Sequence, residues 1–558
     1  MSVSAASSNP APSRRFAFSV PDKSATFWLY ALIGLLAVMH VSMATGRSIN
    51  WDEFWFYSQV ETVARGEFMQ PLQTIHTRFF FWLPAMSGSE IDHILIARVF
   101  MLGCLGVTAG GIYAVAQKFA DHRTALLAAA AYLAAGFTLQ HGASFRVDPI
   151  VTALLTTSLA IAARTRLNAP AIVALGALIG LAAMVTIKFV LWAPAFAGIA
   201  LWRWRDENWN WQYIFRWIAA GAVALSTFAL LYVSHATSGG PQEANAVAGG
   251  ILERTSGKMF SLATSPHLHM SGKAIFTALP LALAAAMVPW AIARGQENWQ
   301  GKTALALMWL PVLTPLYYHN SLPYFHPFIL PPVVVTAVLT LPYVIKRYGS
   351  HMVAGVIAAS ALSVWIVDAR GVTERQHSLV DAVHEIFPEP VAYVDCCGMI
   401  GTFPKVNEFR TRWGIEKYLR TGKPLIREQM LVQPVPLLLD NKREFADAID
   451  GVSEHTLHPQ DAAAVRDTYI RIWGDIFVAG RIIEAQASGI WDVLVPGTYT
   501  VKGTLNVDGE NYRSGDVVTL KRGAVTLRND TAEPVQLVWG ENPATPAGTA
   551  PELYWTSF

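Results

Sequence analysis

Apolar runs of about 17–22 residues recur along the first two thirds of the chain, separated by short polar segments. A helical run of about 20 apolar residues matches the hydrocarbon thickness of a bilayer. The pattern therefore predicts a polytopic α-helical membrane protein with about eleven spans. These are residues 27–45, 95–117, 123–140, 149–163, 171–187, 189–202, 214–234, 274–293, 303–318, 324–345 and 351–368.

The pattern changes after residue 368. Short apolar runs at 391–397 and 436–440 predict buried strands, whereas 407–423 and 458–474 have helical periodicity. From Trp491 onward apolar and polar residues alternate, with a turn at Asp508–Gly509, which predicts a small antiparallel β-sandwich. The expected regions are a disordered cytoplasmic tail (1–24), a transmembrane domain (25–368), a soluble α/β region (369–485) and a β-rich region (486–558).

Composition supports this class. Only 15% of the 558 residues are charged and the mean hydropathy is +0.33, whereas a soluble protein has about 25% charged residues. The net charge of +2 gives no indication of nucleic-acid binding. Three cysteines, Cys104, Cys396 and Cys397, provide neither a disulfide framework nor the spacing of a metal site.

Lysine and arginine predict the orientation, because they gather in cytoplasmic loops. One set of loops, with the adjoining tail, holds Arg14, Arg15, Lys23, Lys118, Arg123, Arg164, Arg166, Arg203, Arg205, Arg216, Arg294, Lys302, Lys346 and Arg347, and its loops are short where the alternate ones are long. The alternate set, 46–94, 235–273 and everything after 368, is therefore predicted to lie outside, in the periplasm of a Gram-negative cell. The first apolar run lacks a small-residue cleavage site, so we expect a retained anchor in the bacterial inner membrane.

Acidic and basic residues gather on the predicted outer side, several at the edges of apolar spans, where an unpaired charge is costly. They are Asp52, Glu53, His76, Arg78, Arg146, Asp148, Lys188, His235, His267, His269, His319, Tyr324 and His326.

Asp52 and Glu53 stand among large aromatic residues in "SINWDEFWFYSQ" (48–59). Helix neighbours point about 100° apart, so one carboxylate can reach a substrate while the other braces the site. The alternative is an acidic pair that solvates a helix end beside an interfacial aromatic belt. Asp148 similarly has two interpretations, as a site residue with Arg146 or as an N-cap before Pro149.

Lys188 lies between apolar segments in "MVTIKFVLWAP", with no acid adjacent in sequence. It either snorkels to the interface or binds a lipid phosphate. His319 and His326 in "YYHNSLPYFHPFILPP" fit a donor-lined cavity, whereas an aromatic belt accounts well for Tyr324. The His267–His269 pair lacks an identifiable third metal ligand, so metal binding is open and a divalent cation is possible.

These segments, in this order, resemble the GT-C superfamily of polyprenyl-phosphate-sugar glycosyltransferases, in the branch of protein O-mannosyltransferases and the lipid A aminoarabinose transferase. The resemblance covers about residues 25–370 and uses five motifs in order: "WDEFWFY", His76 in "TIHTRFFFWLPA", Asp148–Pro149, "TIKFVLWAP" and "PYFHPFILPP". Two features depart from the family pattern: no Pro-Pro follows His76, and Phe189 replaces the usual glycine after Lys188.

The resemblance implies that residues 25–368 are catalytic and transfer a sugar, with inversion, from an undecaprenyl-phosphate carrier to a glycolipid, lipid A, glycan or protein acceptor. Asp52 would be the base that takes the acceptor proton, and Glu53 would bind the acceptor or orient Asp52. Cations placed beforehand would stabilise the departing lipid phosphate. The substrate-binding candidates are Glu53, His76, Arg146, Asp148, Lys188, His319, Tyr324 and His326.

Two other functions fit parts of the sequence. A transporter or flippase of a lipid-linked sugar would also need intramembrane charges, but transporters usually carry inverted repeats and midplane sites, whereas the polar residues here gather at one face. A non-catalytic scaffold that binds cell-wall glycan would not need about eleven spans for anchoring.

Overall fold

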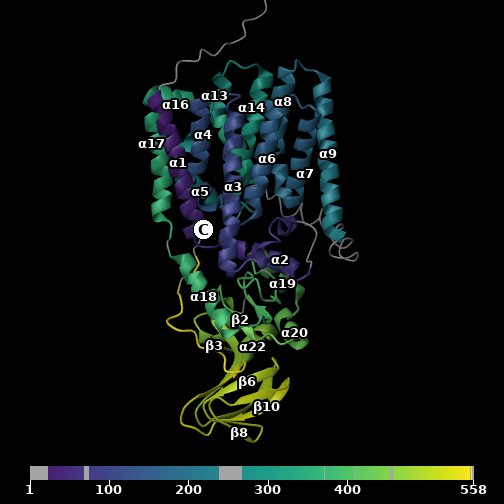
Figure 1. The fold of residues 1–558 in the computed structure, drawn as a ribbon, viewed down its shortest axis with the longest axis vertical. Helices are drawn as coiled ribbons and strands as arrows, with labels where there is room; N and C mark the ends of the chain where they lie inside the picture. The colour runs from purple at the N-terminus through teal and green to yellow at the C-terminus, as the bar shows by residue number, and fades with distance from the viewer. Residues whose placement is uncertain are drawn as a thin grey trace, which may run out of the picture.

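The computed structural model describes residues 23–67, 74–237, 265, 267–369, 371–408, 410–452, 456–552, 554 and 555. Most of the predicted tail (1–24) and of the loop 235–273 lies outside these residues. A bundle of long helices occupies one end of the molecule and the C-terminal region the other (Figure 1).

The apolar runs of the sequence form the helices of the bundle. They are α1 (Lys23–Gly46), α3 (Glu90–Ala116), α4 (His122–Ala134), α5 (Gly136–His141), α6 (Val147–Arg164), α7 (Ala169–Val185), α8 (Ala193–Asp206), α9 (Trp211–Ala236), α11 (Leu268–Thr277), α12 (Leu279–Ala286), α13 (Val288–Arg294), α14 (Trp299–Trp309), α15 (Phe325–Ala337), α16 (Leu341–Tyr348) and α17 (Ser350–Val367).

Several predicted spans are broken helices. The axis bends by 105° between α11 and the α12–α13 segment, and by 65° between α15 and α16. Prolines stand in the first turn of α12 and of α16, where a missing N–H costs no hydrogen bond. In the described part of the chain, five helices are long and apolar enough to cross a membrane, or up to seven if each bent pair is one span.

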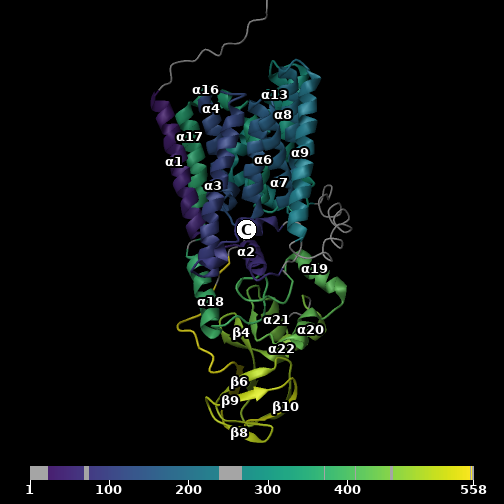
Figure 2. The same cartoon turned by 45° about the vertical axis from the view of Figure 1, so that its right-hand side comes forward.

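The two ends of the bundle differ in charge. The α3–α4, α6–α7, α8–α9, α13–α14 and α16–α17 connections lie at the end away from the C-terminal region (Figures 1 and 2). These connections and the adjoining helix ends contain Lys118, Arg164, Arg203, Arg294 and Arg347, among other basic residues. The basic end predicted to be cytoplasmic is therefore opposite the C-terminal region.

The C-terminal region begins with α18 (Val372–Ile386) and contains two sheets. The seven-stranded sheet has the order β1-β2-β4-β11-β6-β9, with β3 also paired to β4, and the four-stranded sheet has the order β5-β10-β7-β8. The strands are β1 (Tyr393–Val394), β2 (Leu437–Leu439), β3 (Tyr469–Trp473), β4 (Ile476–Ile483), β5 (Ser488–Val493), β6 (Gly497–Lys502), β7 (Leu505–Val507), β8 (Glu510–Tyr512), β9 (Val517–Leu520), β10 (Gly523–Arg528) and β11 (Val535–Trp539). In the described part of this region, the sheets are accompanied by the helices α19 (Arg412–Thr421), α20 (Leu425–Val432), α21 (Glu444–Ile449) and α22 (Pro459–Thr468).

Two details differ from the sequence prediction. The helix predicted over 458–474 ends at Thr468, because the alternating "YIRIW" that follows pairs with β4 as strand β3. The larger sheet also crosses residue 485, where the sequence suggested a boundary, since β4 lies before it and pairs with β11 after it. The α/β and β-rich regions thus share a sheet.

One hydrophobic core joins the bundle to the C-terminal region. A single cluster of buried side chains includes Leu36 and Phe325 of the bundle together with Tyr393, Ile400 and Leu437. The sandwich has a separate core around Trp491, Tyr499 and Leu527. Because the first core is continuous, the α/β region is packed against the membrane helices.

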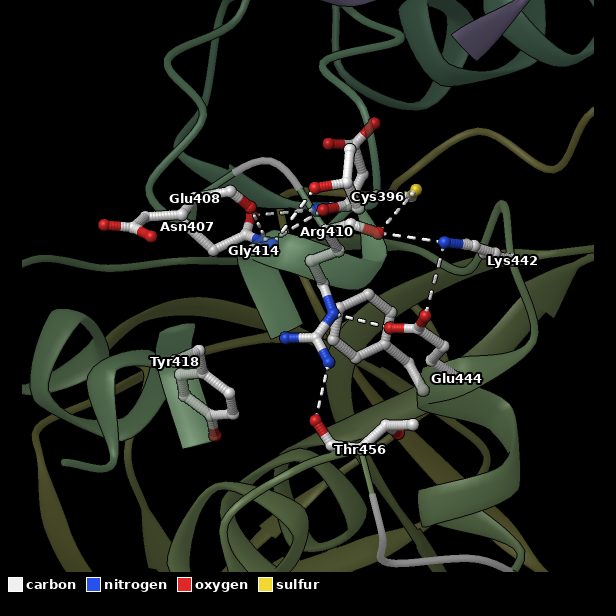
Figure 3. Close-up of polar contacts among 12 residues, drawn as sticks. Cys396, Asn407, Glu408, Arg410, Gly414, Tyr418, Lys442, Glu444 and Thr456 are labelled. Carbon is white, nitrogen blue, oxygen red and sulfur yellow. Dashed lines mark hydrogen bonds and ion pairs between the residues drawn. The ribbon is translucent and has the colours of Figure 1, made fainter. Parts of the chain in front are cut away.

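Arg410 connects the loops of the α/β region (Figure 3). Its side chain is buried, pairs with Glu444 at 2.6 Å and donates to the Thr456 carbonyl at 2.7 Å. Its guanidinium carbon lies 5.3 Å from the Tyr418 ring centroid. The ion pair and the cation–π contact together stabilise the buried charge of Arg410.

Candidate functional site

The acidic pair lies at the first turn of α2 (Trp51–Ala64), between the bundle and the C-terminal region (Figure 2). Asn50 begins this helix with a capping box: its side chain accepts from the Asp52 amide at 2.9 Å, and the Glu53 carboxylate accepts from the Asn50 amide at 3.0 Å. The cap fixes where the helix starts and therefore where each carboxylate points.

Glu53 is completely buried and bound to protein groups. Arg98 of α3 donates to both of its oxygens, at 2.8 and 2.7 Å, and the Phe145 amide donates at 2.7 Å. Burial alone would raise the pKa of Glu53, but the Arg98 charge and the hydrogen bonds outweigh it and hold the pKa below its ordinary value. Glu53 thus joins α2, α3 and the chain segment just before Arg146.

A chain of four charged side chains, the charged cluster, lies beside this pair. Asp52 forms an ion pair with Arg146, Arg146 contacts Asp148 at 3.3 Å, and Asp148 forms an ion pair with Lys188. The side chains come from α2, the start of α6 and the 3₁₀ segment Ile187–Trp192. The cluster balances two carboxylates against two cations, so it can be buried at moderate cost.

Asp52 and Lys188 form the more accessible ends of the charged cluster. The exposed fraction is 14% for the Asp52 side chain and 12% for Lys188, against 5% for Asp148. A ligand can therefore reach an acid at one end and an ammonium at the other. Lys188 is paired with an acid, which a merely snorkelling lysine would not need.

Aromatic rings enclose the cations. The Arg146 guanidinium carbon lies 3.4 Å from the Tyr324 ring centroid and 5.6 Å from that of Phe56. The Lys188 ammonium lies 5.6 Å from the Tyr324 centroid and 5.5 Å from that of Phe328. These rings exclude water and strengthen the electrostatic interactions of the cations with any ligand.

The predicted histidines lie at different distances from the charged cluster. His76 packs edge-on against Phe56 at 5.0 Å, and Phe56 in turn contacts Arg146, so His76 lies at the edge of the site. His326 packs against Phe137 at 5.3 Å and Phe325 at 6.2 Å. His319 is half-buried in the turn before Tyr324.

His235 and Arg78 hydrogen-bond to each other beside the segment that contains His76. His235, at the end of α9, hydrogen-bonds Thr74 at 2.8 Å and accepts from Arg78 at 3.0 Å. These bonds attach the short helix Ile75–Phe79 to the bundle. The two predicted outer residues therefore hold the loop that carries His76.

Arg98 and Phe56 are site residues that the sequence reasoning missed. Arg98 interrupts the apolar run "ILIARVFML", and a lone arginine within a span usually faces a partner. The position of Arg98 within an apolar run could therefore have predicted an ion pair with Glu53. Phe56 gave no such signal, because one more aromatic residue in "WDEFWFY" is also expected of an interfacial belt.

A small cavity adjoins the charged cluster. Its lining includes Thr108, Tyr132, His141, Asp148 and Tyr324. Among the described residues, no group of three or more His, Cys, Asp and Glu side chains gathers as metal ligands. The His267 and His269 rings lie 6.4 Å apart on the turn that begins α11.

Comparisons by sequence find no match: neither a protein-family model nor a curated protein matches the chain. Comparison by structure does. The chain is similar to ArnT from Cupriavidus metallidurans bound to undecaprenyl phosphate, with a TM-score of 0.56, 13% identity, and coverage of 82% of this chain and 98% of ArnT.

Two further solved structures are similar. The same ArnT in the apo state matches with a TM-score of 0.52 and 12% identity over 76% of this chain and 95% of ArnT. The oligosaccharyltransferase AglB from Archaeoglobus fulgidus, in complex with an inhibitory peptide and a dolichol-phosphate, has a TM-score of 0.48 and 9% identity over 92% of this chain and 95% of AglB. The ArnT likeness shows that the chain has the GT-C fold that the sequence motifs predicted.

Proposed function

We propose that this chain is an inverting glycosyltransferase that moves a sugar from an undecaprenyl-phosphate-type carrier to an acceptor hydroxyl at the outer face of the bacterial inner membrane. The charged cluster carries this proposal, because it presents a carboxylate and two aromatic-enclosed cations at one end of the bundle. The GT-C fold supports it, and the similar ArnT structure holds undecaprenyl phosphate.

The phosphate of the carrier would bind Arg146 and Lys188. Both cations are paired with carboxylates in this structure, and an arriving phosphate offers oxygens that can replace those partners. The leaving phosphate gains charge as the bond to the sugar breaks, and cations already in place stabilise that charge without reorganisation.

The same exchange of partners would prepare Asp52. A carboxylate held in an ion pair is a poor proton acceptor, and loss of the Arg146 contact to the phosphate makes Asp52 available as a base. Asp52 then takes the proton of the acceptor hydroxyl as the oxygen attacks the anomeric carbon from the face opposite the phosphate. The C–O bond to the phosphate breaks and the anomeric configuration inverts.

The distribution of charge supports the proposed orientation. The basic loops lie at the end opposite the C-terminal region, and basic loops stay in the cytoplasm. The charged cluster and the C-terminal region then face the periplasm. There the carrier's tail remains in lipid while its sugar meets a water-side acceptor.

The test uses purified protein, synthetic polyprenyl-phosphate sugars and an envelope extract from the source cell as acceptor. We expect a new glycosidic bond, detected by mass spectrometry, with inverted anomeric configuration by NMR. Transbilayer movement of the donor in proteoliposomes without a new glycosidic bond would contradict the proposal and favour a flippase.

A further inference from the structure

The last residues of the chain return from the sandwich to α2. We call residues 541–552 together with Tyr554 and Trp555 the C-terminal strap. Figure 1 shows the yellow end of the chain running from the sandwich along the α/β region to the end of the bundle. Two parts of the chain that are about 500 residues apart in sequence therefore meet beside the charged cluster.

Specific contacts fix the strap along its course. Trp473 donates from its indole nitrogen to the Gly548 carbonyl at 3.2 Å. The Tyr554 hydroxyl donates to the Asp475 carboxylate at 2.8 Å, and the Tyr554 ring is buried with 4% exposure. The strap is thus held by the turn between β3 and β4 and is part of the packed structure.

Trp555 packs against the first turn of α2. Its ring lies 5.7 Å from the Phe54 ring in an edge-on contact and 6.1 Å from the Trp51 ring. Trp51 also faces the ammonium of Lys442, 5.8 Å from the ring centroid. Lys442 itself donates to the Arg410 carbonyl at 2.9 Å, within the network of Figure 3. Trp51 is therefore held by the C-terminal region.

Trp51 directly precedes the candidate base. Neighbouring side chains on a helix point about 100° apart, so Trp51 projects towards the C-terminal region while Asp52 projects towards Arg146. Any rotation of α2 that moves Trp51 relative to Trp555 also moves the Asp52 carboxylate. A displacement of about 1 Å in a reacting group can lower a rate by about 100-fold.

We propose that Trp555 is a positioning residue that sets the orientation of α2, and hence of Asp52, from the C-terminal strap. This inference rests on the proposed function. It assigns the C-terminal region a part in the reaction. Trp555 acts through Trp51 and Phe54, so its loss lowers the rate of transfer more than the affinity for the carrier.

The experiment compares full-length Trp555→Ala, Trp555→Phe and the control Tyr512→Ala, which removes an aromatic ring at the far end of the sandwich. We expect Trp555→Ala to lower kcat at least tenfold with unchanged carrier Kd, and Trp555→Phe to retain most of kcat. In hydrogen exchange, the amides of residues 51–57 should exchange faster in Trp555→Ala than in the wild type. Their exchange rates in Tyr512→Ala should equal those of the wild type.

A double-mutant cycle with Trp51→Ala isolates the contact. If Trp555 acts through Trp51, the double variant should have nearly the same kcat as the more affected single variant. A wild-type kcat in Trp555→Ala would overturn the inference. So would a Tyr512→Ala variant that loses as much kcat and as much carrier affinity as Trp555→Ala does. Failure of the wild-type protein to transfer sugar would contradict the proposed function instead, and the hydrogen-exchange comparison still tests the positioning.

Discussion

At the scale of single residues, the two carboxylates of the Asp-Glu pair have different surroundings: one is partly accessible and the other is buried. Asp52 keeps 14% exposure and pairs with Arg146, whereas Glu53 is enclosed by Arg98 and backbone amides. The cause is the helix geometry of α2, which directs adjacent side chains to different surroundings. A single motif thus places one carboxylate in the charged cluster and buries the other against Arg98.

Lys188 is a proposed ligand of the carrier phosphate, so its substitution tests carrier binding. We expect Lys188→Ala to weaken binding of a polyprenyl phosphate about tenfold or more, because a charge-assisted hydrogen bond to phosphate contributes about 1.5–3 kcal/mol. Lys188→Arg should retain most of the affinity by keeping the charge. Fluorescence or calorimetric titration with undecaprenyl phosphate measures this.

The control for Lys188 is Lys302→Ala, a lysine at the opposite end of the bundle that donates to the Ala293 carbonyl. Its carrier affinity should equal that of the wild type. Unchanged affinity in Lys188→Ala would mean that Lys188 only neutralises Asp148.

At the scale of elements, α2 is fixed by loops of the C-terminal region as well as by its cap. Gly398 has a positive φ of 75°, and a Cβ there would come within 2.8 Å of the Ser58 hydroxyl. A Cβ at Gly401 would come within 2.9 Å of the Tyr57 ring, and Arg65 donates to the Gly401 carbonyl at 3.0 Å. The loop 398–401 therefore needs glycine in order to approach the helix that carries Asp52.

Substitution of Gly398 tests this close approach. Gly398→Ala should lower transfer activity and thermal stability, because the new methyl group pushes the loop away from α2 and also adds backbone strain of about 1–2 kcal/mol. Gly422→Ala is the matched control: Gly422 has φ of 65° but open space around its Cβ position. Both variants carry the backbone strain, so a thermal scan with an activity assay should show a larger effect for Gly398→Ala. Equal effects would exclude a role for the contact with Ser58.

The loop after β2 makes the stability of the C-terminal region depend on pH. Burial, opposed by hydrogen bonds from the Phe445 and Ala446 amides and reinforced by Asp475 and Glu444, raises the pKa of Asp440 from 3.8 to about 6. Between these two pH values the folded state binds more protons than the unfolded state. The stability from this group is therefore present below about pH 4 and is lost as pH rises to about 6.

Asp440→Asn should remove this dependence. We expect the difference in Tm between wild type and variant to change steadily from pH 4 to pH 6 and to stay constant above pH 6.5. The wild type should lose stability relative to the variant as pH rises, by roughly 3 kcal/mol at most for a shift of about two pH units. A constant difference across the whole range would contradict the assignment. Thermal unfolding of the purified protein in buffers of equal ionic strength measures it.

At the scale of the whole molecule, the sequence predicted the architecture better than the arrangement around the site. Apolar runs located the bundle because about 20 apolar residues have few alternatives to a helix. The bends before α12 and α16 occur at short breaks within continuous apolar runs, so hydrophobic periodicity alone could not predict them. The return of Trp555 to α2 is a contact between the two ends of the chain, and local patterns carry no signal for it.

Part of the site could also be predicted from the sequence. Charges placed at the edges of apolar runs must find partners, so Asp52, Arg146, Asp148 and Lys188 could be assigned to one site, and the structure brings them together. His326 followed Tyr324 closely in sequence, but the turn of α15 directs its ring towards Phe137. The pairing of Glu53 with Arg98 depended on the packing of α2 against α3.

The fold places an apolar helical bundle, a charged cluster and the C-terminal region in one continuous structure. In the proposed reaction between a membrane-held donor and an acceptor from outside, Asp52 is the base. Loss of the Asp52 charge should leave Arg146 and Lys188, the proposed phosphate ligands, in place.

The most direct measurement is the kcat of sugar transfer by Asp52→Asn, taken together with its Kd for undecaprenyl phosphate. Removal of a general base costs about 100-fold to 10,000-fold in rate, so kcat should fall by at least 100-fold. The Kd should stay equal or decrease, since Arg146 no longer has a charged partner in Asp52. A kcat near that of the wild type would contradict the account.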